Sequence, residues 1–263
     1  MLIGSSPRFQ PGETAWITGA STGIGFAIAE RLAREGVHVA LSARREPELE
    51  AAANRIRQVG GEASTFPLDV GDVSAIGSVA KQIVKALGRL DIVVPSAGMH
   101  LVLPFDAISP KRCGELLDVQ IRGAIETVRS ALPGLRKSGA RSDGQGRILF
   151  VSSVAAQGRG WPGNSVYAAS KGAQTTLMRN LAVELADAGV RVNAVAPGIV
   201  RTPMQERLYS RIPPDQQEKL TRSHPLGLGD ADDVAAAATF LLSYEARWIT
   251  GAQLAVDGGA LVA

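Results

Sequence analysis

The 263-residue sequence has a single cysteine, no long apolar run and no large excess of charge of either sign. One cysteine, Cys113, excludes a disulfide within the chain and fits a reducing compartment. No stretch of 18 apolar residues occurs, so we expect no transmembrane helix. Residues 1–12 lack the apolar centre of a signal peptide, so we expect residues 1–11 to form a flexible leader and the protein to be cytoplasmic.

The net charge of +3 comes from basic residues that are scattered along the chain. A loose basic cluster between residues 136 and 147 is interrupted by Ser, Gly and Asp, and no aromatic residues alternate with it. We interpret it as a solvated loop and expect neither nucleic acid nor a membrane as a partner. An apolar content of 45% over this length suits one large domain with a sizeable core.

Short apolar segments alternate with amphipathic helical patterns without a break in composition. This alternation predicts an α/β fold, a single doubly wound (Rossmann) domain over 12–263 with a seven-stranded, mostly parallel sheet and helices on both faces. We predict strands at 14–18, 37–42, 63–68, 90–94, 148–151, 191–196 and 253–256. We predict helices near 24–35, 47–59, 74–87, 111–132, 165–187 and 232–244, and a loop at 137–146. The segment 199–229, with four prolines, is the best candidate for a substrate lid.

A glycine-rich turn follows the first predicted strand and precedes the first predicted helix. Residues 19–25 read Gly-Ala-Ser-Thr-Gly-Ile-Gly, which is the spacing G-x-x-x-G-x-G. Glycines let the backbone approach a phosphate closely, and the N–H groups at a helix start face the anion. The candidate phosphate-binding residues are therefore Gly19, Ser21, Thr22, Gly23, Ile24 and Gly25.

The residues after the second predicted strand bear on the cofactor. An acid there would bind the ribose 2′-hydroxyl of NAD, whereas an arginine would accept the 2′-phosphate of NADP. The sequence has Arg44 and Arg45, while Glu46 comes late and suits the start of the next helix. We therefore predict that NADP(H) is preferred and that NAD(H) remains possible. Asp69, after the third strand, would accept a hydrogen bond from adenine or else cap the next helix, a role open also to Asp72 or Ser74.

Tyr167 and Lys171 are four residues apart near the start of a predicted helix, so both project from one face. Because a nearby ammonium favours the phenolate, we expect Lys171 to lower the pKa of Tyr167 from about 10. Ser153 would lie at the carboxyl end of a buried strand, where open α/β sheets bind ligands. Together these groups suit proton transfer to a carbonyl oxygen. For the Tyr/Lys spacing alone, the alternative is a surface pair beside a capping serine.

The motifs, taken in order, resemble those of the classical short-chain dehydrogenases/reductases over residues 12–260. The matched segments are Thr18-Gly19-x-x-x-Gly23-Ile-Gly25, Asp69-Val70, Ala97-Gly98, Ser153, Tyr167-x-x-x-Lys171, Pro197-Gly198 with Thr202, and Asp257-Gly258-Gly259. Within the family, the chain is similar to the branch that contains 3-oxoacyl-carrier-protein reductases.

The resemblance implies an NADP(H)-dependent oxidoreductase that acts on a small-molecule carbonyl or secondary alcohol. Tyr167 would be the general acid or base, Lys171 would hold the nicotinamide ribose, and Ser153 would bind the substrate oxygen. Further cofactor contacts are implied at Asp69, Val70, Ser96, Ala97, Gly98, Pro197, Gly198 and Thr202, beside Tyr167 and Lys171. The resemblance also implies a homo-oligomer, a tetramer or a dimer, formed through the helices 111–132 and 165–187.

Several residues bear on the shape of the substrate pocket. The residues that line the cleft in the family suggest an apolar pocket, although they could equally be packing residues: Met99, His100, Leu101, Trp161, Met204 and Leu208. We interpret His100 as a loop histidine rather than a catalyst.

Two positions depart from the family pattern. Pro95-Ser96 stands where the family usually has Asn-Asn, and Pro95 has no N–H to donate. Gln120 stands where the family usually has an asparagine whose backbone holds a water that connects the lysine with solvent. Gln120 is also a polar residue in an apolar helical stripe, so it should need a partner. We expect the relay to survive, with Gln120 as part of the catalytic set.

These departures motivate two other readings. One is a non-catalytic dinucleotide-binding sensor or scaffold. A purely structural assembly protein is a third reading, but it would need neither Lys171 nor the glycine turn.

Overall fold

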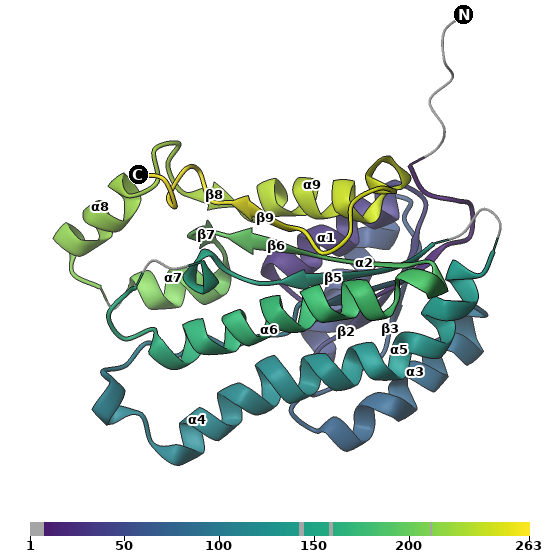
Figure 1. Cartoon of the computed structure of the whole chain (residues 1–263), viewed down its shortest axis with the longest axis horizontal. Coiled ribbons are helices and arrows are strands. Elements are labelled where there is room, and N and C mark those ends of the chain that lie inside the picture. The colour runs from purple at the N-terminus through teal and green to yellow at the C-terminus, as the bar shows by residue number, and fades with distance from the viewer. Residues whose placement is uncertain (1–7, 142–144, 158–159, 211) are drawn as a thin grey trace, which may run out of the picture.

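Seven strands form one parallel sheet in the order β3-β2-β1-β4-β5-β6-β9 (Figure 1). The computed structural model describes residues 8–141, 145–157, 160–210 and 212–263. The strands are β1 Thr14–Thr18, β2 His38–Ser42, β3 Ala63–Thr65, β4 Ile92–Pro95, β5 Gly146–Val151, β6 Val190–Pro197 and β9 Gln253–Val256. The predicted doubly wound α/β fold and its seven-stranded sheet are thus confirmed.

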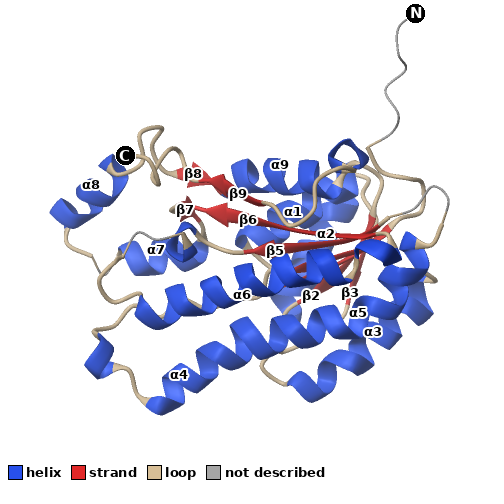
Figure 2. Ribbon diagram, in the orientation of Figure 1, coloured by secondary structure: helices blue, strands red, loops and turns tan. Residues whose placement is uncertain are grey.

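Helices cover both faces of this sheet (Figure 2). On one face, the core contains residues of α1 Gly23–Arg34, α2 Glu46–Gln58 and α9 Ala231–Leu242. On the other face it contains residues of α3 Val73–Leu87, α5 Gly123–Gly139 and α6 Ser165–Glu184. Successive side chains of a strand point to opposite faces, so Ala15 and Ile17 join the first core while Trp16 joins the second.

The strand order reverses beside β1, since β2 lies on one side of it and β4 on the other. The loops that leave the carboxyl ends of β1 and β4 therefore diverge at this point. Crevices at such switch points bind ligands in open α/β sheets. This geometry places the glycine turn after β1 next to the segment 96–98 after β4.

The long helix predicted over 111–132 is extended and interrupted in the structure. It consists of α4 Pro110–Leu117, a π-helical turn Asp118–Arg122, and α5, which continues to Gly139 through Pro133. The loop that we predicted to begin at residue 137 therefore begins only after Gly139, where α5 ends. Tertiary contacts explain the extension, because Leu135 is fully buried and the Ser138 hydroxyl donates to Asp91 at 2.7 Å.

The third strand is shorter than the range 63–68 that we predicted. The regular ladder with β2 ends at Thr65. The chain nevertheless stays beside β2, because Phe66 N donates to Leu41 O and Leu68 N donates to Ala43 O.

The ends of the chain segment 199–229 are held together. β7 Val200–Arg201 pairs with β8 Gly229–Asp230, and α7 Pro203–Tyr209 and α8 Pro214–Arg222 lie between them. In Figure 1 both helices lie beyond the carboxyl ends of β5 and β6, on the side where α6 begins. The substrate lid that we expect in this segment stays a prediction.

The leader predicted over residues 1–11 is in part packed against the domain. Residues 1–7 lie outside the described residues, but Phe9 is buried in the first core and Arg8 forms ion pairs with Glu35 and Glu245. Among the described residues, no helix has the length and apolar character needed to cross a membrane.

Candidate active site

Ser153, Tyr167 and Lys171 come together at the carboxyl edge of the sheet. Ser153 follows β5, and its hydroxyl accepts a hydrogen bond from Ala155 N at 3.2 Å, which holds the start of a short 3₁₀ turn. Tyr167 and Lys171 lie one turn apart on α6. The Tyr167 phenol is hydrogen-bonded to the Ser153 side chain, and Lys171 Nζ lies 5.9 Å from the centroid of the tyrosine ring. The hydroxyl groups of Ser153 and Tyr167 can therefore share one ligand atom, with the ammonium of Lys171 beside them.

Lys171 is a buried cation without an anionic partner in the described part of the chain. Its side chain is only 6% exposed, and its ammonium donates to Val151 O at 2.7 Å and to Gln174 Oε1 at 3.1 Å. Because burial disfavours the charged form, the pKa of Lys171 falls to about 7. A modest change in its surroundings will therefore change its charge near neutral pH.

The pKa of Tyr167 differs from the expectation. Burial raises the pKa of this phenol, and the hydrogen bond with Ser153 opposes the rise only in part. The expected lowering by Lys171 is not found, because the ammonium is directed to a main-chain carbonyl and an amide rather than to the phenol oxygen. Tyr167 therefore carries its proton at neutral pH, as a proton donor must.

Gln120 has the partner that its place in an apolar stripe required. It is fully buried in the π-helical turn, and its Nε2 donates to Met99 O and to Ser170 Oγ, each at 3.1 Å. Ser170 Oγ in turn donates to Tyr167 O at 2.6 Å. The side chain of Gln120 thus connects the segment after β4 with the helix that carries Tyr167.

The glycine turn packs directly against the segment after β4. Gly19 and Gly23 have φ of +69° and +63°, in the left-handed region that favours glycine. A Cβ on Gly19 would lie 2.7 Å from Ala97 Cα, and a Cβ on Gly25 would lie 2.5 Å from Gly19 O. Side chains at these positions would displace the turn.

The first turn of α1 fits a phosphate. The Thr22 side chain forms no capping bond there, and no acidic residue occupies that turn. Its N–H groups therefore retain the character of an anion site. The start of the segment 199–229 approaches the same turn, because Thr202 Cγ2 lies 3.4 Å from the Cβ position of Gly23. The residues present thus fit the diphosphate of a nicotinamide dinucleotide.

Arg44 and Asp69 lie side by side at the carboxyl ends of β2 and β3. Arg44 Nη1 is 3.9 Å from Asp69 Oδ2, and both side chains are exposed. Asp69 does not cap α3, because Asp72 accepts from Ser74 N and performs that role. Glu46 belongs to the first turn of α2 and does not take the place of Arg44 at the end of β2. The exposed side chain of Arg44 can therefore face a ligand.

The other predicted cofactor residues line the same edge. Pro95 ends β4 in register with Thr18, and Thr18 Oγ1 accepts from Ala97 N at 3.3 Å. Gly198 N donates to Val256 O at 3.0 Å, just after β6. Of the remaining predicted residues, Ser21 lies in the turn before α1 and Ile24 in the first turn of that helix. Val70 is buried in the second core, and Ser96 lies beside the glycine turn.

Two further residues of this edge were not predicted. His224 is buried, its Nε2 accepts from Ile199 N at 3.0 Å, and its Nδ1 bonds with Leu220 O at 2.9 Å. It therefore ties the two ends of the segment 199–229 together. Gln174 contacts the ammonium of Lys171, and its spacing of three residues from Lys171 was a signal that could have revealed it.

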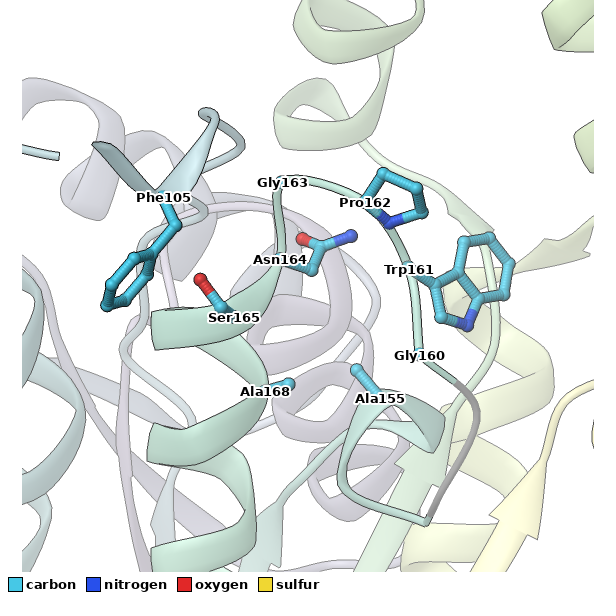
Figure 3. A pocket seen from close by; sticks show the side chains of 9 residues that line it. All are labelled: Phe105, Ala155, Gly160, Trp161, Pro162, Gly163, Asn164, Ser165 and Ala168. Carbon is cyan, nitrogen blue, oxygen red and sulfur yellow. The ribbon is translucent and has the colours of Figure 1, made fainter. Parts of the chain in front are cut away.

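A cavity of about 440 Å³ lies at the start of α6, the helix that carries Tyr167. Figure 3 shows Phe105 and Trp161 on opposite sides of it. Among the described residues, no charged side chain lines it; the lining residues are Phe105, Ala155, Gly160, Trp161, Pro162, Gly163, Asn164, Ser165 and Ala168. His100 lies next to it, with its ring 4.2 Å from that of Tyr167 and its Nε2 2.8 Å from Asn164 Oδ1.

Comparison with known proteins agrees with this geometry. A family model described as enoyl-(acyl carrier protein) reductase matches residues 19–260. The oxidoreductase UcpA of Salmonella typhimurium is 36% identical over an alignment of 253 residues, and 94% of each chain is covered. The chain belongs to the short-chain dehydrogenase/reductase family. It is therefore an enzyme that acts on CH–OH or C=O groups with a nicotinamide dinucleotide.

Two solved members of the short-chain dehydrogenase/reductase family have the same fold. A 3-ketoacyl-(acyl-carrier-protein) reductase from Brucella melitensis, complexed with NADH, is 32% identical with a TM-score of 0.87, and 96% of this chain and 99% of that chain are covered. A short-chain dehydrogenase from Burkholderia cenocepacia in complex with NADP is also 32% identical, with a TM-score of 0.82 and the same coverage. The family thus includes close structural neighbours with either cofactor.

Proposed function

We propose that the protein is an NADP(H)-dependent oxidoreductase that interconverts a carbonyl compound and a secondary alcohol. The observation that carries this proposal is the grouping of Ser153, Tyr167 and Lys171 beside a glycine turn that fits a diphosphate. The bound nicotinamide would supply or accept the hydride. The protein residues orient the substrate and move the proton.

Each side chain has a role that its surroundings support. Ser153 and Tyr167 would hold the substrate oxygen between two hydroxyl groups, and Tyr167 would give its proton to that oxygen during reduction. Burial keeps the phenol protonated until the oxygen acquires negative charge. Lys171 would bind the nicotinamide ribose and, in its charged form, stabilise the phenolate that remains. The reverse transfers would serve oxidation.

The preference for NADP(H) rests on Arg44. Its guanidinium is exposed beside Asp69 at the end of β2, where a 2′-phosphate would be bound. Arg45 is the next residue along the chain and also an arginine, but its guanidinium is already paired with Glu48 at 2.9 Å. Removal of the Arg44 guanidinium should therefore weaken NADPH binding selectively.

Paired fluorescence titrations with NADPH and NADH test this preference. We expect tighter binding of NADPH, with Arg44→Ala weakening NADPH binding about tenfold or more while NADH binding changes little. Arg45→Ala is the control and should leave both affinities almost unchanged. Tighter binding of NADH by the unaltered protein would reject the NADP preference, and binding of neither cofactor would reject the proposed reaction.

The cavity supports a substrate with an uncharged, apolar portion. Phe105, Trp161 and Pro162 line it, and none of the described residues that line it carries a charge to neutralise a charged substrate. A panel of aliphatic, cyclic and aromatic ketones, together with enoyl and 3-oxoacyl thioesters, would identify the class through oxidation of NADPH. Turnover of charged keto acids in preference to apolar ketones would contradict this substrate proposal.

The second candidate is a non-catalytic dinucleotide sensor. Pro95 and Gln120, which depart from the family pattern at the site, favour it. Binding of NADPH without turnover across the whole panel would support this candidate. Turnover that Tyr167→Phe removes would reject it.

We further propose a homo-oligomer, a tetramer or a dimer, formed through α4, α5 and α6. Apolar side chains on these helices are exposed, with Val183 at 80% and Ile125 at 41%. Covering them against a second copy would remove apolar surface from water. Light scattering should give a mass above that of one chain, and Val183→Asp should reduce it; a monomeric unaltered protein would contradict the proposal.

A further inference from the structure

The side chain of Gln174 lies between the ammonium of Lys171 and the main chain of the neighbouring helix. It projects from α6 and is only 1% exposed. Its Nε2 donates to Gln120 O at 2.5 Å, and its Oε1 accepts from Lys171 Nζ at 3.1 Å. One buried amide therefore connects both elements that frame the catalytic group.

The carbonyl of Gln120 is available because of the local helix geometry. Asp118–Arg122 forms a π-helical turn, in which hydrogen bonds span five residues and the regular four-residue pattern is interrupted. A donor from outside the helix can then approach this carbonyl. The family resemblance implies a water at this position, but here the amide of Gln174 makes one of its hydrogen bonds directly.

The two contacts determine how the amide is oriented. A carbonyl only accepts hydrogen bonds and an ammonium only donates them, so the NH₂ group must face Gln120 and the oxygen must face Lys171. Reversing the amide would place donor against donor and acceptor against acceptor. Only a side chain that both donates and accepts, with the length of glutamine, fits the bridge at position 174.

We propose that Gln174 is a positioning residue, which holds the ammonium of Lys171 in the active site through this direct bridge to the main chain of Gln120. The proposal rests on the role given above to Lys171 in the proposed reaction. Val151 O and Gln174 Oε1 take two of the three ammonium hydrogens. The third remains for a ligand or for the phenolate of Tyr167.

The charge of Lys171 should depend strongly on this bridge. Tyr167 on α6 and His100 from the segment after β4 are the titratable groups that face it, and no carboxylate in the described part of the chain pairs with it. Neutral acceptors alone therefore stabilise the ammonium in a buried place. Removing one of them or charging one of them should change the pKa of Lys171 in opposite directions.

Nuclear magnetic resonance can measure that pKa without any turnover. The chain has six lysines, so protein labelled with ¹³C at lysine Cε gives few signals, and Lys171→Met assigns the signal of interest. In Gln174→Met, which keeps the length but loses both hydrogen bonds, we expect the pKa of Lys171 to fall by about half a pH unit or more. In Gln174→Glu, we expect it to rise by about one pH unit or more.

Thr175→Val is the matched control. Thr175 is buried one residue further along α6 and bonds with the main-chain oxygen of Lys171, but it does not contact the ammonium. This variant should leave the pKa of Lys171 unchanged. The same pattern should appear in kcat, with its alkaline limb shifted to lower pH in Gln174→Met and to higher pH in Gln174→Glu.

Shifts of the same sign in both Gln174 variants, or no shift in either, would overturn the proposal. If Gln174→Met fails to fold, Gln174→Glu is compared with Thr175→Val: a rise confined to the glutamate variant shows that position 174 contacts the ammonium, and no rise would overturn the proposal. Cofactor titration separates this inference from the proposed function. Opposite pKa shifts without NADPH or NADH binding would support the bridge and reject the reductase, whereas cofactor binding and turnover without the shifts would do the reverse.

Discussion

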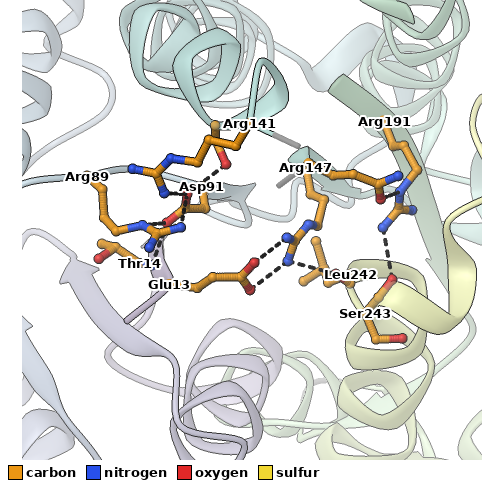
Figure 4. Close-up of polar contacts among 11 residues, drawn as sticks. Glu13, Thr14, Arg89, Asp91, Arg141, Arg147, Arg191, Leu242 and Ser243 are labelled. Atoms are coloured by element: carbon orange, nitrogen blue, oxygen red, sulfur yellow. Dashed lines mark hydrogen bonds and ion pairs between the residues drawn. The ribbon is translucent and has the colours of Figure 1, made fainter. Parts of the chain in front are cut away.

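At the amino edge of the sheet, buried carboxylates are paired with arginines (Figure 4). Glu13, just before β1, accepts two hydrogen bonds from Arg147 of β5. Asp91, just before β4, accepts from Arg89 at 2.7 and 2.8 Å. Arg191 of β6 donates to Leu241 O and Ser243 O at the end of α9, where a helix terminus favours a cation.

At the carboxyl edge, buried polar groups have fewer and weaker partners. Lys171 is held by neutral acceptors only, and the Oε1 atom of Gln120 has no hydrogen-bond partner. The chain places no carboxylate against Lys171 among the described residues, although it places one against each of two arginines at the opposite edge.

The difference agrees with the proposal that the carboxyl edge carries the chemistry while the amino edge stabilises the fold. Oppositely charged pairs hold the strands in place, although Arg147 Nε has no hydrogen-bond partner, and they have no reason to change protonation. A buried ammonium without a counter-charge costs stability and has a pKa near neutral pH, which is typical of functional sites. Four substitutions test this contrast.

Tyr167→Phe should have the largest effect on chemistry and almost none on folding. Loss of the phenol proton should reduce kcat by about 10²- to 10⁴-fold for the best carbonyl substrate. The ring and its contact with His100 remain, so the melting temperature and NADPH affinity should change little. Steady-state kinetics, thermal unfolding and fluorescence titration measure the three quantities. An active variant would assign the proton to another group.

Arg147→Met should have the largest effect on stability. It leaves the Glu13 carboxylate buried without its cation, which should cost about 3 to 5 kcal/mol of unfolding free energy. The double variant Glu13→Gln with Arg147→Met removes both charges and should recover most of that loss. Urea denaturation compares them. Equal destabilisation by the single and double variants would mean that the pair itself, rather than the orphaned charge, carries the effect.

Lys171→Met should stabilise the fold in a pH-dependent way. The pKa of Lys171 is about 7 in the folded protein against an ordinary 10.5, so its burial cost is complete below pH 7 and disappears as pH rises toward 10.5. At pH 6 we expect a gain of about 2 to 5 kcal/mol, shrinking to almost none near pH 10.5. Denaturation of both proteins at several pH values measures this difference. A gain that is constant with pH would contradict the depressed pKa.

His224→Ala should have the smallest of the four effects. Loss of its bonds with Ile199 N and Leu220 O loosens the ends of the segment 199–229, and NADPH binding should weaken about threefold to tenfold. His38→Ala, at the amino edge, is the control: His38 bonds with Ser64 at 2.9 Å, far from the proposed cofactor. Equal losses in both variants would indicate general destabilisation rather than a role in holding the segment.

Much of the fold was predictable because short apolar segments alternate with amphipathic helical patterns along the whole chain. The glycine turn was predictable for a similar reason, since positive φ at Gly19 and Gly23 is a local demand. The extent of α5 was not, because the polar, glycine-containing run from residue 137 pointed to a loop, whereas burial of Leu135 and the contact of Ser138 with Asp91 kept the helix. Distant contacts outweighed local preference there.

The same division holds at the site. The sequence alone placed Ser153, Tyr167 and Lys171 on a strand end and one helix face, because spacing along a regular element determines direction. It could not show the raised pKa of Tyr167 or the bridge through Gln174, which depend on burial and on a carbonyl 54 residues away. Local spacing therefore determined which groups are present at the edge of the sheet. Only the tertiary structure decided their hydrogen bonds and charges, because both depend on what packing brings near them.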